Sequence, residues 1–379
     1  MDYKKLQDKC RGSLVGGAVG DALGFRVEFM SLSEIRSQFG KKGITRYDSR
    51  AGEAHFSDDT QMTLYTLEGM MNGVVATKAG KTEDILPYIE KAYLNWYETQ
   101  ISFPKDLQES WISKLRPLWA RRCPGMTCLS ALESISRGQS AVNDSKGCGG
   151  VMRVAPIGIF NAVHHNLYDY ADTARLAGWA AEITHKHIAS TFASALLATT
   201  VMNCIHDEMV DRMQFFFIVT GGLIMMREYF PDHDSQLQEF DSLIRRALEL
   251  GKSDIPDEEA IHELGEGWTG DEAIAIAVYA VMRHIESFED CIVCAVNHDG
   301  DSDSTGAIAG NIIGAILGYS AIPSYYLDHL ELEPILVSMA DDLCADVKDR
   351  AVNLRIGQRY IDHLPAGIDT DSLISTDPE

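Results

Sequence analysis

The chain has 379 residues, 45% of them hydrophobic, and a chain of that length can bury about three-quarters of the surface that it exposes when unfolded. Its 56 acidic residues outnumber 33 basic ones, and the formal net charge of −23 is spread along the chain. Because phosphate backbones and anionic bilayers attract stripes of Lys and Arg, this balance argues against binding to nucleic acid or to a membrane. An anionic small ligand would need a local source of positive charge.

The sequence predicts a cytoplasmic protein. Its first twelve residues, MDYKKLQDKCRG, lack the apolar stretch of a signal peptide. Eight cysteines in a chain this long do not form a dense disulfide framework, so we interpret them as reduced thiols. Cys291 and Cys294 have the spacing of a zinc or redox pair, but no second pair follows at zinc spacing. We therefore expect two packing cysteines in a buried helix.

Helical periodicity dominates the rest of the chain. In chain order, GITRY at 43–47 is the best strand candidate, and helices are expected over 62–74, 174–204 (with no strong breaker after Gly178), 215–226, 272–284 and 306–323. The apolar segments 215–226 and 306–323 are expected to be core helices, because the first is too short to cross a bilayer and Asn311 interrupts the second.

The domain organisation follows from the connectors. Pro and Gly cluster only in short segments such as 122–125 and 251–256, and not in a long linker. The sequence therefore predicts one compact all-α domain over residues 1–363, followed by an acidic, weakly ordered tail over residues 364–379.

Two helical segments carry glycine at every fourth position. The first stripe is Gly12, Gly16, Gly20 and Gly24, and the second is Gly306, Gly310, Gly314 and Gly318. Glycine inside a helix costs about 1 kcal/mol relative to alanine, so eight of them indicate helices whose backbones approach closely. Each stripe lies next to an acidic segment.

The two acidic segments share one composition. FSDDT (56–60) and GDSDS (300–304) each combine two carboxylates with two hydroxyls: Ser57, Asp58, Asp59 and Thr60 in the first, and Asp301, Ser302, Asp303 and Ser304 in the second. Part of this pattern is helix capping, because Asp58 with Gln61 fits a capping box and Asp303 could cap its own helix.

Capping uses one carboxylate for each helix, and each segment has two. Hard divalent cations take carboxylate, hydroxyl, carbonyl and water oxygens, so the surplus suggests a cation site that both segments form together. The spacing does not match an EF-hand loop, because no Glu occupies its twelfth position. From spacing alone, a metal site and a pair of solvated caps remain equally open.

Five segments, in this order, resemble the ADP-ribosylglycohydrolase family: GSLVGGAVGDALGFRVEF (12–29), FSDDTQMTL (56–64), GCGGVMRVAPIGIF (147–160), THKH (184–187) and GDSDSTGAIAGNIIGAILG (300–318). That family includes dinitrogenase reductase-activating glycohydrolases and hydrolases of ADP-ribosyl-arginine and ADP-ribosyl-serine. The resemblance implies a compact all-α fold with two divalent cations, Mg²⁺ first and Mn²⁺ as the alternative, at the bottom of a cleft.

Carried over position by position, the resemblance assigns the metal ligands to Ser57, Asp58, Asp59, Asp301, Asp303 and Ser304. Many members have Thr where this chain has Ser57, and both supply a hydroxyl oxygen. The resemblance also gives Glu28, on a loop near the scissile bond, a catalytic role beside Asp59 and Asp303. Asp21 is interpreted as a structural cap.

The segment NDSKGCGGVMR (143–153) offers free backbone N–H groups before a helical segment, which suits an anionic diphosphate. The resemblance places the ADP-ribose diphosphate there, so the candidate substrate-binding residues are Ser145, Lys146, Gly147, Cys148 and Gly149, with His185 near the ribose. Cys148 replaces the usual Asn and removes one side-chain hydrogen bond.

Three further residues of interest have open or ordinary interpretations. Arg153 is either a buried salt-bridge partner or a ligand contact. Trp268 is expected to pack in the core, with lining of the cleft as the alternative. His187 is interpreted as an ordinary surface or core residue.

The resemblance implies a hydrolase that removes ADP-ribose from protein side chains. Two cations would orient the 2″ and 3″ hydroxyls of the distal ribose, and a metal-associated water would attack C1″ through an oxocarbenium-like transition state. Glu28 or a metal-bound Asp would manage the proton. The cations would also let an acidic protein accept a diphosphate.

The linkage that is cut is less defined. SDDT together with DSDSTG is closer to the arginine-cleaving members than to the serine-cleaving ones. The alternatives are ADP-ribosyl-serine, O-acetyl-ADP-ribose, ADP-ribosylated nucleic acid, or a non-catalytic ADP-ribose-binding protein. The expected partners are an ADP-ribosylated protein as substrate and ADP-ribose as product.

Overall fold

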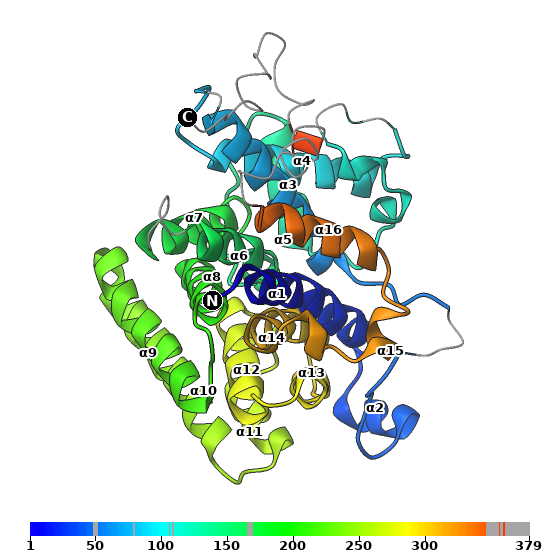
Figure 1. The fold of residues 1–379 in the computed structure, drawn as a ribbon, viewed down its shortest axis with the longest axis vertical. Helices are drawn as coiled ribbons and strands as arrows, with labels where there is room; N and C mark the ends of the chain where they lie inside the picture. Colours follow the sequence, from blue (N-terminus) through cyan, green and yellow to red (C-terminus); the bar gives the residue numbers. More distant parts are fainter. Residues whose placement is uncertain are drawn as a thin grey trace.

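The computed structural model describes residues 1–47, 52–78, 80–105, 107, 110–164, 170–345, 356 and 359–360. These residues form helices and loops, with no β-strand among them (Figure 1). The all-α prediction is therefore confirmed, whereas the proposed tail over 364–379 lies outside the described residues.

The α-helices are α1 (Tyr3–Gly24), α2 (Leu32–Phe39), α3 (Asp58–Lys78), α4 (Leu86–Ile101), α5 (Met126–Ser136), α6 (Ala155–Val163), α7 (Tyr170–Glu182), α8 (Ile188–His206), α9 (Arg212–Tyr229), α10 (Asp234–Lys252), α11 (Asp257–Leu264), α12 (Gly270–Arg283), α13 (Phe288–Val296), α14 (Ser302–Leu317), α15 (Ser324–Leu327) and α16 (Glu333–Leu343). Short 3₁₀ helices are η2 (Ile112–Lys114), η3 (Arg116–Trp119), η4 (Cys148–Arg153), η5 (Pro231–His233) and η6 (Tyr319–Ala321).

The strand expected over 43–47 is wrong, because the side-chain amide of Asn297 satisfies the backbone there. Ile44 donates its N–H to Asn297 Oδ1 at 2.7 Å, and its carbonyl accepts from Asn297 Nδ2 at 2.8 Å. Gly43 before it has a φ of +73°, which also departs from strand geometry. The segment is coil that is held by a side chain instead of a neighbouring strand.

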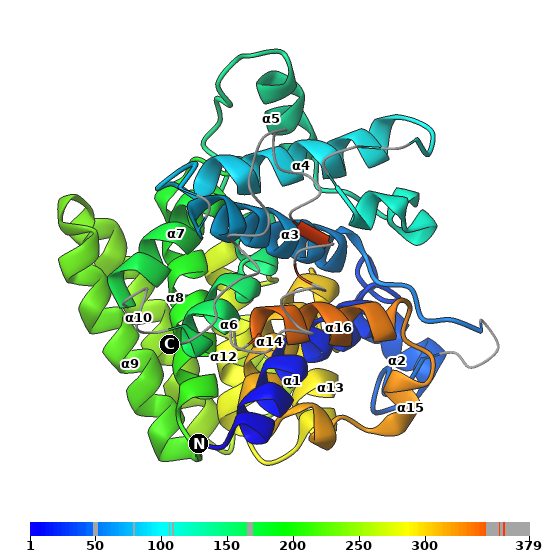
Figure 2. The same cartoon turned by 45° about the horizontal axis from the view of Figure 1, so that its top comes forward.

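The glycine stripes form the closest helix pair, α1 against α14, which run antiparallel and lie side by side (Figures 1 and 2). A Cβ atom added to Gly12 would lie 2.3 Å from the carbonyl oxygen of Gly314, and one added to Gly20 would lie 1.9 Å from that of Gly306. No side chain fits at these contacts, so the predicted close approach is confirmed. The end of α1 consequently meets the beginning of α14.

The beginning of α3 is fixed from α1 by Asp21. Its Oδ1 accepts the Ser57 N–H at 2.8 Å, and its Oδ2 accepts the N–H and the hydroxyl of Thr60 at 2.9 and 2.5 Å. The structural role expected for Asp21 is confirmed, and the helix that it caps is α3. The two acidic segments are thereby both attached to the α1–α14 pair.

The expected helical segment over 174–204 is divided into α7 and α8 by a loop at 183–187. Arg153 Nη2 donates to Ala180 O at 3.0 Å and to Thr184 Oγ1 at 2.7 Å, and His187 Nδ1 accepts the Ala189 N–H to cap α8. The interruption comes from these tertiary contacts, and no local breaker in the sequence announces it. His187 is therefore a helix cap.

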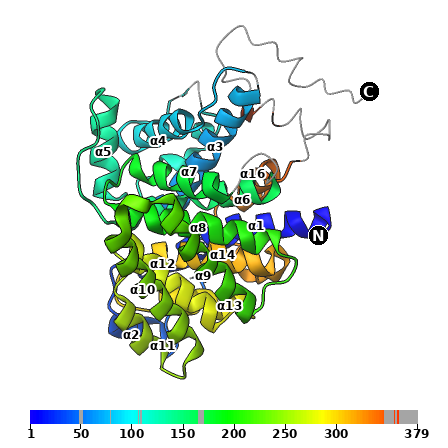
Figure 3. The same ribbon diagram turned by 90° about the vertical axis from the view of Figure 1, so that its left-hand side faces the viewer.

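The apolar helices differ in burial. Within the described residues, α8 alone is long and apolar enough to cross a membrane, and 89% of its apolar window is buried inside the protein, as in a core helix. The helix that contains 306–317 is buried as expected. In contrast, α9 lies on the outside of the fold (Figure 3) and exposes Met213, Phe217 and Ile224, so the expectation that 215–226 is a core helix holds for one face only. Cys291 and Cys294 pack as free thiols in the core.

Candidate functional site

The two acidic segments meet in one pocket with a volume of about 290 Å³. The pocket collects the loop after α1, the beginnings of α3 and α14, and the segment 147–149. Its acidic residues are Glu28, Asp58, Asp59, Asp301 and Asp303, and no Lys or Arg is among the described residues that line it. Side chains from distant parts of the sequence thus form one carboxylate cluster, named here the acidic pocket.

The first acidic segment turns its side chains toward the second. Ser57 is the residue before α3, it is fully buried, and its Oγ accepts the Asp59 N–H at 3.1 Å. Asp58 Oδ2 accepts the Gly125 N–H at 3.2 Å, while Asp59 Oδ2 is buried without a hydrogen-bond partner among the described residues.

The capping box expected from Asp58 and Gln61 is therefore wrong. The side chain of Gln61 instead accepts from Trp96 Nε1 at 3.1 Å and donates to the Ala120 carbonyl at 2.9 Å. The helix begins at Asp58, and its capping hydroxyl belongs to Ser57. Both carboxylates of this segment thus remain outside the reciprocal cap.

The second acidic segment has its N-cap at Asp301, whereas Asp303 was expected to provide the cap. Asp301 Oδ1 accepts the Ser304 N–H at 3.2 Å, and Asp303, in the first turn, accepts the same N–H at 3.1 Å. Gly300 makes this turn with a φ of +127°, and Asp301 donates its N–H to Glu266 O at 2.9 Å. The residue before the helix takes the cap, which leaves Asp303 directed into the pocket.

Glu28 completes the cluster. It is only 8% exposed, and its Oε2 finds no hydrogen-bond partner among the residues that the structure describes. One carboxylate oxygen each from Glu28, Asp301 and Asp303 lie within 4.8 Å of one another. An isolated surface glutamate is thus excluded, and Glu28 shares the pocket with the proposed metal ligands.

The electrostatics of the acidic pocket are those of buried, uncompensated carboxylates. Burial, followed by the charges of Asp303, Asp301 and other carboxylates, raises the pKa of Glu28 to about 10. Burial likewise raises the pKa values of Asp58, Asp59 and Asp301 well above their ordinary range. Such a group of carboxylates is stable only when protons or cations offset its charge.

The donor set of the acidic pocket fits divalent cations. It offers carboxylate oxygens from both segments and the hydroxyls of Ser57 and Ser304, and hard cations take oxygen ligands of this kind. The partnerless oxygens of Asp59 and Glu28 are directed to the same cluster. The residues of the acidic pocket therefore fit the two divalent cations that the family resemblance implies.

The proposed diphosphate loop contributes only part of its residues to the pocket. Gly147, Cys148 and Gly149 line it. Ser145 instead stabilises the loop, because its Oγ accepts the Gly147 N–H at 3.2 Å, and Lys146 is exposed while its carbonyl accepts the Gly270 N–H at 2.7 Å. Cys148 is half-buried and lines the pocket together with Asp301 and Ser304, and burial, followed by the charges of Asp301 and Asp59, raises the pKa of its thiol well above the ordinary value.

His185 lies beneath this loop, with Nε2 beside Gly147. Burial, followed by the Arg153 charge, lowers the pKa of His185 to about 3, so the ring is neutral. Its Nδ1 contacts Thr184 Oγ1 at 2.9 Å, and the same hydroxyl accepts from Arg153. Thr184 can therefore donate to Nδ1, which leaves Nε2–H as a donor toward the loop.

Arg153 takes neither of its two expected roles. It is fully buried, and its guanidinium lies 4.1 Å from the centroid of the Tyr93 ring and donates to a carbonyl and a hydroxyl. No carboxylate pairs with it among the described residues, and it is not part of the pocket lining. Arg153 holds the loop between α7 and α8 in place.

Two aromatic side chains at the pocket were not identified as a pair from the sequence. Phe29 is 70% exposed and stacks on Trp268, which is 39% exposed, with ring centroids 5.8 Å apart. Trp268 thus lines the cleft, and the expectation of core packing was wrong. The sequence signal for this aromatic pair was the position of Phe29, which directly follows Glu28, the only acidic residue of the loop after α1.

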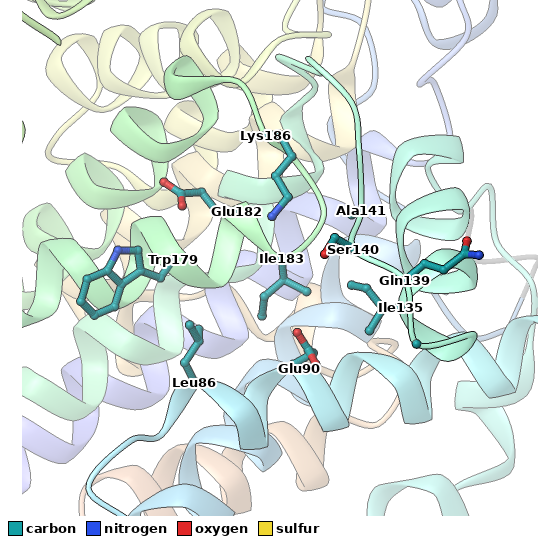
Figure 4. A pocket seen from close by; sticks show the side chains of 11 residues that line it. Leu86, Glu90, Ile135, Gln139, Ser140, Ala141, Trp179, Glu182, Ile183 and Lys186 are labelled. Atoms are coloured by element: carbon teal, nitrogen blue, oxygen red, sulfur yellow. The ribbon is translucent and has the colours of Figure 1, made fainter. Parts of the chain in front are cut away.

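A larger hollow of about 440 Å³ lies between α4, α7 and the segment 138–141 (Figure 4). Its labelled side chains include Glu90, Trp179, Glu182 and Lys186, and it shares no lining residue with the acidic pocket. It lacks a carboxylate cluster, so its larger volume does not make it the better candidate for chemistry.

Comparison with known proteins agrees with this geometry. A family model described as ADP-ribosylglycohydrolase matches residues 2–353. ADP-ribosyl-[dinitrogen reductase] glycohydrolase of Rhodospirillum rubrum is 26% identical over 342 residues, covering 88% of this chain and 94% of that protein. ADP-ribosylarginine hydrolase Tri1 of Serratia proteamaculans is 25% identical over 346 residues, covering 89% of this chain and 79% of that protein.

A solved structure, named ADP-ribosylglycohydrolase-related protein complex, has the same fold. Its TM-score is 0.61 at 23% sequence identity, and the match covers 90% of this chain and 98% of that one. The family match spans both acidic segments, the loop at 147–149 and the glycine stripes. The chain belongs to the ADP-ribosylglycohydrolase family.

Proposed function

We propose that this protein hydrolyses the N-glycosidic bond between ADP-ribose and an arginine side chain of a modified protein, with two divalent cations in the acidic pocket. The proposal places it in the cytoplasm, with ADP-ribosylated protein as substrate and ADP-ribose as product. The observation that carries it is the meeting of Glu28 with both acidic segments in one buried pocket.

The cations would be held by Ser57, Asp58 and Asp59 from one side and by Asp301, Asp303 and Ser304 from the other. When bound, they supply Lewis-acid polarisation, orientation of the ribose hydroxyls and positive charge for a diphosphate. The proposed identities are Mg²⁺ or Mn²⁺, both of which suit oxygen ligands.

The remaining residues would orient the substrate and handle the proton. Once bound cations offset the neighbouring carboxylates and Glu28 is ionised, its buried oxygen, which has no partner among the described residues, can accept a proton from an attacking water in the pocket. The Gly147 and Cys148 N–H groups are bound to Ser145 Oγ and to the Trp268 carbonyl, so the donors proposed for phosphate and ribose oxygens are the Gly149 N–H and the neutral His185 ring, which add no charge.

The arginine linkage is favoured by charge and by one relative. No Lys or Arg is among the described residues that line the acidic pocket, so apart from the proposed cations a cationic guanidinium leaving group meets no positive charge there. The Serratia relative is named an ADP-ribosylarginine hydrolase. A serine hydroxyl as leaving group would not gain from this field.

The test is a panel of linkages. Arginine-linked, serine-linked and nucleic-acid-linked ADP-ribose are incubated with chelated protein and then with Mg²⁺ or Mn²⁺ added back, and free ADP-ribose is measured. We expect release from the arginine linkage only, and only after a cation is restored.

Two variants separate the proposal from its alternatives. Asp59→Asn and Asp303→Asn should lose release while circular dichroism stays unchanged. Full activity in both would refute the two-cation site. Tight binding of ADP-ribose by wild type without release from any linkage would favour a binding protein instead of an enzyme.

A further inference from the structure

We infer that Asp257, His284 and Cys294 form a separate metal site, which binds Zn²⁺ at the junction of α11, α12 and α13 (Figure 1). A carboxylate oxygen, a ring nitrogen and the thiol sulfur of these residues all lie within 4.8 Å of one another. None of the three residues lines the acidic pocket. The inference therefore goes beyond the proposed function, because it assigns a different ion to a different part of the fold.

The spacing of Asp257 and His284 is close to that of two ligands of one ion. Asp257 Oδ2 and His284 Nε2 are 3.6 Å apart, which is too long for a hydrogen bond. Two oxygen or nitrogen ligands that bind a tetrahedral Zn²⁺ at about 2.1 Å lie about 3.4 Å from each other. An ion could therefore bridge these two atoms with little movement of either side chain.

The ring of His284 provides the second observation. Its Nε2 is closed to solvent and has no hydrogen-bond partner among the residues that the structure describes. A buried polar atom without a partner is costly and rare in native proteins, and an ion that is absent from the coordinates is one cause. The nitrogens of a neutral imidazole are common metal ligands, so a bound ion would satisfy Nε2.

Asp257 is oriented so that one of its oxygens remains for the ion. The buried Tyr279 hydroxyl donates to Asp257 Oδ1 at 2.6 Å, and Arg283 Nε lies 3.6 Å from the same oxygen. Carboxylates that bind metals are usually hydrogen-bonded in this way by neighbouring side chains. Tyr279 and Arg283 thus hold the carboxylate at Oδ1, and Oδ2 is the atom next to His284.

Cys294 decides the identity of the ion. It lies in α13 and is 6% exposed, and burial, followed by the charge of Asp257, raises the pKa of its thiol well above the ordinary value. On binding, the S–H bond breaks, a sulfur–metal bond forms, and the proton passes to the buffer without electron transfer. Thiolate, carboxylate and neutral imidazole balance a divalent charge. A set of S, N and O ligands suits Zn²⁺, whereas Mg²⁺ requires oxygen ligands.

Another group with similar spacing lacks these properties. Glu53, His55 and Glu331 also bring ligand atoms within 4.8 Å of one another. Arg122 donates to both oxygens of Glu331, however, and Glu53 and His55 are exposed. A guanidinium that occupies the buried carboxylate takes the place of a cation, so this group carries no metal site.

Co²⁺ titration of the chelated full-length protein in excess Mg²⁺ tests the site. A Co–S bond gives a near-ultraviolet charge-transfer band, which oxygen and nitrogen ligands do not give. Wild type should gain this band with one equivalent of Co²⁺ and lose it when Zn²⁺ is added. Cys294→Ser should lack the band, and His284→Gln should bind Co²⁺ at least tenfold more weakly. The matched control is Cys291→Ser, one turn earlier in α13 and outside the group, which should keep the band and the affinity.

Thermal unfolding with Zn²⁺ separates this site from the acidic pocket. Zn²⁺ should raise the Tm of Asp59→Asn as it does that of wild type, and it should leave the Tm of His284→Gln unchanged. No charge-transfer band in wild type, or a band that persists in Cys294→Ser, would overturn the inference. Equal Co²⁺ affinities in wild type and His284→Gln would overturn it as well, and this measurement decides the matter if Cys294→Ser does not fold. The linkage panel tests the proposed function independently of all these results.

Discussion

Replacing Gly24 with alanine should weaken cation binding as well as the fold. Gly24 is the last residue of α1, where this helix meets the beginning of α14. A Cβ atom there would lie 2.1 Å from the carbonyl oxygen of Ser302 and 2.6 Å from the Cα atom of Asp303. All of these atoms belong to the backbone, so no side-chain rotation relieves the overlap.

The size of this overlap determines how much stability and cation affinity Gly24→Ala should lose. Ordinary contact between a Cβ and an oxygen begins near 3.4 Å, so the beginning of α14 must move by about 1 Å, and overpacking of this kind costs about 1–3 kcal/mol. Asp303 moves with it. Loss of the correct placement of a metal ligand lowers affinity by roughly 10–100-fold, the range found when groups that support such ligands are removed.

Two other glycines provide matched controls. Gly12 has the same kind of clash, 2.3 Å from the Gly314 carbonyl, but lies about 18 Å from Gly24 along α1. Gly12→Ala should lower stability without changing cation affinity. Gly221, in α9, has no atom within 4 Å of an added Cβ, so Gly221→Ala should stabilise by about 0.5–1 kcal/mol through helix propensity alone.

The measurements are urea unfolding for stability and calorimetric titration with Mg²⁺ or Mn²⁺ for affinity. Equal affinities in Gly24→Ala and Gly12→Ala would refute the link between the helix contact and the cation site. If Gly24→Ala gained stability as Gly221→Ala does, the close contact itself would be refuted.

Three further predictions concern buried charge. Burial raises the pKa of Glu68 from 4.5 to about 7, so the folded state keeps a proton that the unfolded state loses, and this residue should contribute about 3 kcal/mol to the fall in stability as the pH rises through this window. Because the carboxyls of the acidic pocket contribute a fall of their own, urea unfolding of Glu68→Gln should show a fall that is smaller than that of wild type by about this amount, and an equal fall in both would contradict the prediction. Arg122 pairs with Glu331, which is 2% exposed, so Arg122→Ala should lower the free energy of unfolding by about 3–5 kcal/mol. Recovery of stability in Arg122→Ala/Glu331→Gln would identify the buried Glu331 charge as the cause, whereas an unchanged free energy of unfolding in Arg122→Ala would exclude that cause. Adding Mg²⁺ or Mn²⁺ to chelated protein at 100 times Kd should stabilise it by about 2.7 kcal/mol for each ion, seen as a higher Tm, and an unchanged Tm would contradict cation binding to the native state.

Those features of the fold were predictable that a repeated residue pattern within one segment indicates. Repeated glycine in two helical segments requires a close partner, and the two stripes proved to be each other's partner. The loop at 183–187 was not predictable, because Arg153, which lies thirty residues before it in sequence, draws Thr184 out of the helix. Asn297 prevents the strand at 43–47 in the same way, through contacts that only the tertiary fold creates.

The candidate site was likewise predictable in its residue types and not in its side-chain directions. Residue types and spacing identified the acidic segments, and the structure brings them together with Glu28. The directions of side chains could not be predicted from the sequence: Ser145 turns to its own loop, where its Oγ accepts the Gly147 N–H, and Lys146 is exposed. Such directions depend on which backbone groups the neighbouring segment binds, here those at 266–270.

The architecture also explains how buried carboxylates can be gathered without basic residues. Both α3 and α14 begin at the acidic pocket, so the positive ends of two helix dipoles face the carboxylates. Asp21 binds the first turn of α3 and occupies donors that would otherwise neutralise the cluster. Helix ends offset only part of the charge, since each contributes about half an elementary charge. The remaining negative charge makes cation binding and folding two parts of one equilibrium, because an ion bound here stabilises the same contact between α1 and α14 that positions its ligands.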